Sequence, residues 1–119
     1  PGNFTNKQTL NLGTGSIKGE ISLGDFNEDG NIDLAFPLSA DGVMRHELST
    51  SLFIFLGDGT GNFVQGQTVT VGQEPGSTWA ADFNHDGHVD IACSNRPYGM
   101  RSILLGNGTG GFTTHTTMQ

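Results

Sequence analysis

The stretch Asp25-Phe-Asn27-Glu-Asp29-Gly30-Asn31-Ile-Asp33 recurs 57 residues later as Asp82-Phe-Asn84-His-Asp86-Gly87-His88-Val-Asp90. Both copies place a carboxylate or amide oxygen at positions 1, 3, 5 and 9, and a glycine at position 6. Calcium takes about six to eight oxygen ligands in an irregular cage, and the glycine permits the sharp turn that such a cage needs. We therefore predict two Ca²⁺ sites, with position 7 adding a backbone carbonyl. The predicted ligands are Asp25, Asn27, Asp29, Asn31, Asp33, Asp82, Asn84, Asp86, His88 and Asp90.

The flanks of these loops separate them from an EF-hand, which needs helices on both sides and a bidentate glutamate at position 12. Position 12 is Phe36 in one copy and Cys93 in the other. The flanking residues alternate between apolar and other side chains, which is typical of half-buried strands. The alternative is an Asx-rich turn without a metal. Acids at positions 1, 5 and 9 in both copies favour calcium between two strands.

Other segments repeat as well. Gly2-Asn-Phe4 recurs as Gly61-Asn-Phe63, and Leu56-Gly-Asp-Gly-Thr-Gly-Asn-Phe63 is matched by Leu105-Gly-Asn-Gly-Thr-Gly-Gly-Phe112. The order within a repeat is strand, acidic loop, strand, variable loop, strand, glycine-rich turn, strand. We expect repeat 1 over about 4–62, repeat 2 over about 63–111, and the start of a third outer strand over 112–119.

The pattern predicts nine strands and an all-β chain. The runs at 51–56 and 102–105 are nearly continuously apolar, so we expect central strands there. The threonine-rich runs at 63–71 and 112–118 are expected to be outer strands. The predicted strands are 4–12, 20–25, 32–38, 51–56, 63–71, 78–82, 89–94, 102–106 and 112–118.

Segments Leu23–Ala35 with Leu56–Phe63, and Ala81–Ala92 with Leu105–Phe112, resemble the FG-GAP/VCBS repeat. This resemblance implies integrin-α-like β-propeller blades with a calcium ion in each acidic hairpin. It also implies an extracellular protein of the adhesion, lectin or surface type. The expected fold is therefore two four-stranded propeller-type blades plus one extra outer strand.

Two blades are fewer than a closed propeller needs, and they leave apolar faces and sheet edges bare. The segments 4–12 and 112–118 both look like the same outer strand. We therefore expect either self-association, in a ring or a filament, or further blades of a longer array.

The composition restricts which binding partners and which cellular location we expect. Twelve acidic residues face five basic ones, so there is no basic patch for nucleic acid. The sequence contains no transmembrane run and no signal peptide, and its single cysteine, Cys93, is expected to be a buried, inert thiol. Calcium loops of millimolar affinity favour an extracellular, secreted or cell-surface location. Asn3 and Asn107 fit the N-glycosylation pattern, so the protein is a candidate glycoprotein.

A second candidate site lies in the loop between two predicted strands, where aromatic, basic and amide side chains gather. Its candidate residues are Asn95, Arg96, Tyr98 and Arg101. Loops at one end of a rigid scaffold often carry binding residues, and an ordinary solvated loop is the alternative. Trp79 is expected at a blade interface rather than in a ligand platform.

No nucleophile elbow, Ser-His-Asp arrangement or phosphate loop is present, so we do not expect an enzyme. The sequence favours a non-catalytic calcium-binding module for adhesion, surface assembly or filament formation, with a protein or glycan ligand. The alternatives are a glycan-binding (lectin) module and an accessory propeller fragment of a secreted polysaccharide-acting enzyme.

Overall fold

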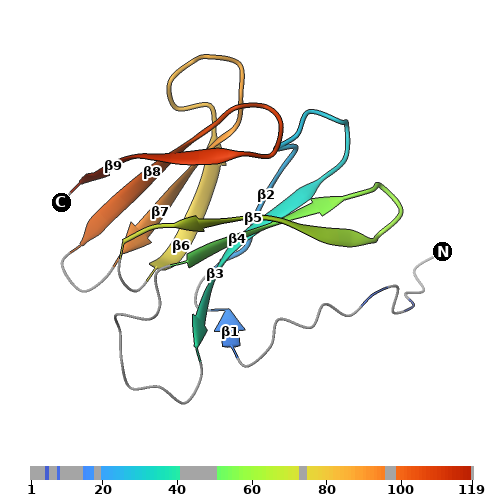
Figure 1. Ribbon diagram of the computed structural model, residues 1–119, viewed down its shortest axis with the longest axis horizontal. Coiled ribbons are helices and arrows are strands. Elements are labelled where there is room, and N and C mark those ends of the chain that lie inside the picture. The colour runs from blue at the N-terminus through green and yellow to red at the C-terminus, as the bar shows by residue number, and fades with distance from the viewer. Residues whose placement is uncertain are drawn as a thin grey trace.

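The computed structural model shows only β-strands as regular elements in the part of the chain that it describes (Figure 1). The described residues are 5, 8, 15–17, 20–40, 51–72, 75–95 and 99–118, with the backbone alone for 15–17, 38–40 and 116–118. These residues contain no helix that is long and apolar enough to cross a membrane.

The first sheet is antiparallel and contains β1 (Gly15–Ile17), β2 (Ser22–Gly24), β3 (Asp33–Ala40), β4 (Ser51–Gly57) and β5 (Phe63–Thr70). Both β1 and β2 pair with β3, β1 along Leu38–Ala40 and β2 along Asp33–Ala35. These two short strands follow one another along the same edge, so the sheet is four strands wide. The apolar strand β4 is internal and β5 is an edge strand, as the sequence predicts.

The second sheet repeats this arrangement with β6 (Pro75–Ala81), β7 (Asp90–Asn95), β8 (Met100–Gly106) and β9 (Phe112–Met118), in the order β6-β7-β8-β9. Proline is tolerated at the first residue of a strand, which allows β6 to begin at Pro75. The first acidic loop connects β2 to β3, and the second connects β6 to β7. The predicted fold of two four-stranded antiparallel units is confirmed.

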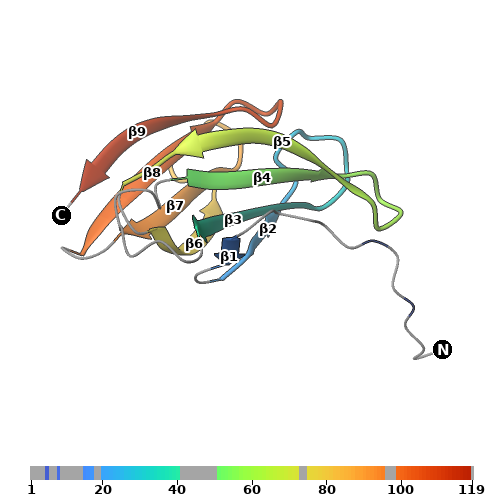
Figure 2. The ribbon, with the colours of Figure 1, turned by 60° about the horizontal axis from the view of Figure 1, so that its bottom comes forward.

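The two sheets lie face to face, with the apolar core between them (Figure 2). Side chains alternate across each strand, so one face of every central strand enters this core. Phe26, from the first acidic loop, packs edge-on against Phe112 of β9, with ring centroids 5.4 Å apart. The buried core residues are Phe26, Ala35, Leu52, Ile54, Val69, Val71, Ile91, Cys93, Leu104 and Phe112.

Two strand predictions differ from the structure. The strand β1 was not predicted, because a three-residue segment that begins with glycine shows no alternation of apolar residues. The extra outer strand predicted over 4–12 lies mostly outside the described residues. Of that segment the structure describes Thr5 and Gln8, and neither residue is in a strand.

The single cysteine is expected to be chemically inert in the folded protein. Cys93 is 0% exposed, and burial raises the pKa of its thiol to about 11. Because the thiolate is the reactive form, a thiol reagent at pH 8 should label Cys93 only after the protein is unfolded in denaturant. Rapid labelling of the native protein at the rate of a free thiol would contradict this burial.

Candidate metal centre

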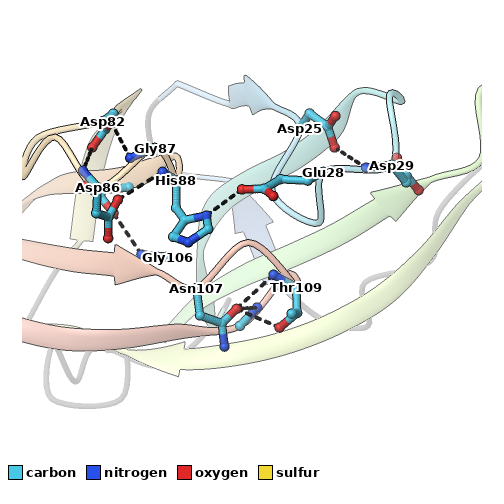
Figure 3. Close-up of polar contacts among 12 residues, drawn as sticks. Asp25, Glu28, Asp29, Asp82, Asp86, Gly87, His88, Gly106, Asn107 and Thr109 are labelled. Carbon is cyan, nitrogen blue, oxygen red and sulfur yellow. Dashed lines mark hydrogen bonds and ion pairs between the residues drawn. The ribbon is translucent and has the colours of Figure 1, made fainter.

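The two acidic loops are built by the same hydrogen bonds. In the first loop, the carboxylate of Asp25 accepts the backbone N–H groups of Asp29 and Gly30, at 3.0 and 2.8 Å. In the second loop, Asp82 accepts those of Asp86 and Gly87, at 3.1 and 2.9 Å (Figure 3). Position 1 therefore holds the turn at positions 5 and 6 in both copies.

The carboxylates at position 5 are held in the same way. Asp29 accepts the backbone N–H of Asn31 and the side-chain amide of Asn27, at 2.9 and 3.1 Å. Asp86 accepts the N–H of His88 and the amide of Asn84, at 2.9 and 3.2 Å. The backbone bond from position 7 is the main cause that lowers the pKa of each carboxyl. Both carboxyl groups are therefore ionised at neutral pH, which is the form in which a carboxylate binds a cation.

Glycine is required at position 6, because Gly30 and Gly87 have φ angles of 87° and 90°. Glu28 and His85 at position 4 also have a positive φ, 59° in each case. The sharp turn expected from the glycine at position 6 is therefore present in both loops, and the structure adds that positions 4 and 6 have a left-handed backbone.

The carboxylates at position 9 tie each loop to its sheet. Asp33 is 0% exposed and accepts the N–H groups of Phe26 and Gly57, at 2.7 and 2.9 Å. Asp90 is equally buried and accepts those of Phe83 and Gly106, both at 2.9 Å. Since a carboxylate has about four lone-pair sites, each of these groups keeps acceptor capacity for a cation.

The residues of the second loop fit a calcium ion. Asp82, Asp86 and Asp90 each offer a carboxylate oxygen, and these three oxygens lie within 4.8 Å of one another. Among the described residues this is the one such group of three or more, so the three equivalent carboxylates of the first loop do not gather as closely. In the first loop, the side-chain oxygen of Asn27 is buried and has no hydrogen-bond partner. An all-oxygen donor set with an unpaired buried oxygen matches the preference of a hard cation.

The histidine at position 7 of the second loop contacts a side chain of the first loop. Nδ1 of His88 contacts Oε1 of Glu28, so that the second loop is joined to the first (Figure 3). The hydrogen bond with Glu28 is the main cause that raises the pKa of His88. Only the backbone of His88 and Asn31 was predicted to serve the cation, and the contact with Glu28 was not foreseen.

Of the second predicted site, the structure describes only Asn95 and Arg101. Asn95 is 3% exposed, and its side-chain oxygen accepts the hydroxyl of Ser102 at 2.9 Å. Arg101 is exposed on β8. Arg96 and Tyr98 lie outside the described residues, as does the candidate glycosylation residue Asn3. Asn107 is exposed in the turn between β8 and β9.

Sequence reasoning missed the polar contacts that close the glycine-rich turns. Asp58 accepts the backbone N–H and the hydroxyl of Thr60, at 2.8 and 2.6 Å. Asn107 accepts the same two groups of Thr109, at 2.9 and 2.6 Å. The shared pattern of an acid or amide, glycine and threonine could have indicated these Asx-type turns.

We expect Asp58 to titrate unusually low. Its bonds to Thr60, with the hydroxyl contributing most, lower its pKa to about 2. A depressed pKa stabilises the folded state above the ordinary carboxyl range, and this contribution is lost as the pH falls through about 2. Carboxyl NMR should find a midpoint near 2 for Asp58, and Thr60→Val should raise it. An ordinary midpoint in the unsubstituted protein would contradict the turn geometry.

Comparison with protein families finds that residues 40–93 match the FG-GAP-like repeat. The match begins at the end of β3 and ends within β7, so it contains the second acidic loop. Comparison with curated proteins and with solved structures finds no match to this chain.

Proposed function

We propose, from the match of residues 40–93 to the FG-GAP-like repeat, that the chain is a calcium-stabilised, propeller-type module for extracellular binding or assembly. The observation that carries the proposal is the identical bonding of the two acidic loops. In both, the carboxylates at positions 1, 5 and 9 are fixed by the same backbone donors at the same spacing. A turn that served only to reverse the chain would not need three oriented carboxylates twice.

Calcium would act on the structure rather than on a substrate. Seven of the twelve acidic residues lie in the two loops, where their charges repel one another at short range. A divalent cation would supply the compensating charge. The ligands that we assign are those predicted from the sequence, at positions 1, 3, 5, 7 and 9 of each loop. The module is proposed to be non-catalytic.

The proposed location follows from the affinity that such loops provide. Extracellular calcium modules have dissociation constants of roughly 10⁻⁴–10⁻³ M. At about 1–2 mM free calcium, binding would add roughly 0.5–2 kcal/mol of stability per site. Sites of this kind would remain nearly empty at the low calcium concentration of a cytosol, which favours a secreted or cell-surface module.

Isothermal titration calorimetry tests the proposal through its stoichiometry. The unsubstituted protein should bind two calcium ions, while Asp29→Asn and Asp86→Asn should each bind one, because each variant loses the charge of one ligand. Asp58→Asn is the matched control, since Asn107 already fills the equivalent position in the second sheet, and it should still bind two. Binding of no calcium by the folded protein, or of two ions by both loop variants, would overturn the assignment.

A further inference from the structure

The first acidic loop is in contact with the second sheet at position 2 of the loop. The carbonyl of Phe26 accepts the backbone N–H of Gly110 at 2.9 Å, and its ring packs against Phe112 of β9. Phe26 is 1% exposed, whereas Phe83, which fills the same position in the second loop, is 44% exposed. The first loop is therefore held in part by the turn that connects β8 to β9 in the other sheet.

The same turn is fixed by the second acidic loop. Asp90, at position 9 of that loop, accepts the N–H of Gly106 at 2.9 Å, and Gly106 ends β8. Within the turn, the side-chain oxygen of Asn107 accepts the backbone N–H groups of Thr109 and Gly111, at 2.9 and 3.2 Å. One internally bonded turn thus connects a carboxylate of the second loop to the backbone of the first.

A direct contact between the two loops lies beside this turn. Nδ1 of His88, at position 7 of the second loop, contacts Oε1 of Glu28, at position 4 of the first loop (Figure 3). A side-chain carbon added at Gly108 would lie 2.6 Å from this nitrogen and 2.7 Å from this oxygen, so the turn packs closely against both groups. Glu28 lies between the predicted ligands Asn27 and Asp29. The contact therefore reaches the part of the first loop that would hold the cation.

The two loops differ in how closely their carboxylates gather. One oxygen from each of Asp82, Asp86 and Asp90 lies within 4.8 Å of the others, whereas the equivalent acids of the first loop do not form such a group. The affinity of a calcium loop depends on the number of charged ligands and on the rigidity of the site. Both loops have three aspartates at the same positions, so the second loop needs less rearrangement to bind a cation.

We propose that the two cation sites are coupled, so that calcium bound at the second loop prepares the first loop to bind. The proposal rests on the calcium binding proposed above and gives its order and regulation. A cation in the second loop would fix the carboxylate of Asp90 and the backbone of His88. The turn that contacts Phe26 and the imidazole that contacts Glu28 would then be held in place. Because these contacts are ordered in advance, the first loop loses less conformational entropy when its own acids gather. The coupling is reciprocal, as linkage requires.

A calcium titration followed by ¹H–¹⁵N NMR reads the two sites separately, because the amides of Gly30 and Gly87 each belong to one loop. In the unsubstituted protein, Gly87 should reach half of its shift at a lower calcium concentration than Gly30. In Asp86→Asn, Gly30 should need roughly three- to tenfold more calcium, since couplings between sites are typically about 5–150-fold in affinity. In Asp29→Asn, Gly87 should respond at a nearly unchanged calcium concentration, because the second loop binds first.

Variants of the contact itself test which residues carry the coupling. His88→Asn introduces the residue that fills position 7 of the first loop, and Glu28→Asn shortens the side chain of its partner and removes its charge. Each should move the midpoint of Gly30 toward that of Asp86→Asn. The double variant should move it no further than either single variant, because both remove the same contact.

His85→Asn is the matched control for Glu28→Asn. His85 fills position 4 of the second loop, is exposed, and has the same φ of 59° as Glu28. Asparagine tolerates this left-handed backbone at both positions, so the two substitutions differ in the contact that they remove. The control should leave the midpoint of Gly30 unchanged.

The outcomes separate the coupling from the calcium assignment. Both loops could bind calcium while Gly30 of Asp86→Asn responds at the concentration of the unsubstituted protein; the coupling would then be wrong and the calcium assignment would stand. The same conclusion follows if Gly30 responds before Gly87, or if His85→Asn acts as strongly as Glu28→Asn. If neither amide responds to calcium in the unsubstituted protein, both proposals are overturned.

Discussion

Replacing Asp90 by alanine is expected to lower the free energy of unfolding by roughly 2–6 kcal/mol, even without calcium. The buried carboxylate accepts the N–H groups of Phe83 and Gly106. The substitution leaves both donors, the buried N–H of Gly106 and the partly buried N–H of Phe83, without their partner. An unsatisfied group costs about 1–3 kcal/mol, and the cost is highest where the group is fully buried. Urea unfolding in the presence of a chelator measures this effect apart from any metal.

Asp86→Ala is the matched control for this experiment, since Asp86 belongs to the same loop but is exposed. In chelator it should be much less destabilised than Asp90→Ala, whereas both variants should lose calcium at the second loop. Asp33→Ala should reproduce the large effect in the first loop, because Asp33 bonds to Phe26 and Gly57 in the same way. Equal stability of Asp90→Ala and the unsubstituted protein would contradict the anchoring role.

The second large effect is expected at the glycine that ends β8. A side-chain carbon added at Gly106 would lie 2.1 Å from the carbonyl oxygen of Val89, and one added at Gly57 would lie 2.2 Å from that of Ile32. Because both obstacles are backbone atoms, a strand must move away from its loop. Gly106→Ala and Gly57→Ala should each cost about 3 kcal/mol or more, as severe overpacking does.

Gly66→Ala provides the comparison, because the added carbon would meet its nearest atom at an ordinary 3.4 Å. This variant should melt close to the unsubstituted protein. Thermal denaturation followed by circular dichroism compares the three substitutions directly. A Gly106→Ala protein with an unchanged melting temperature would show that the loop and β8 are less closely packed than described.

The strand order was predictable because this chain repeats itself, and because apolar and polar side chains alternate clearly along its strands. Apolar runs such as 51–56 could only be internal strands, and the glycine-rich turns marked the hairpins. The strand β1 was not predictable, because its three residues carry no pattern and are positioned by pairing with Leu38–Ala40.

The acidic positions of the candidate site were also predictable, since ligand spacing is a local property of the sequence. The different roles of the individual acids could not be predicted. Asp33 and Asp90 look like the other acids in the sequence, and only the fold brings Gly57 and Gly106 to them. The contact between Glu28 and His88 spans 60 residues, and the pairing of two loops across sheets leaves no local signal.

The central claim is that both acidic loops bind calcium, and a calcium titration followed by ¹H–¹⁵N NMR tests it most directly. The account predicts that the largest amide shifts fall in two groups of the same pattern, within 25–33 and within 82–90. The amides of Gly30 and Gly87, which donate to Asp25 and Asp82, should be among the most affected. Spectra that do not change, or that change only outside the two loops, would contradict the account.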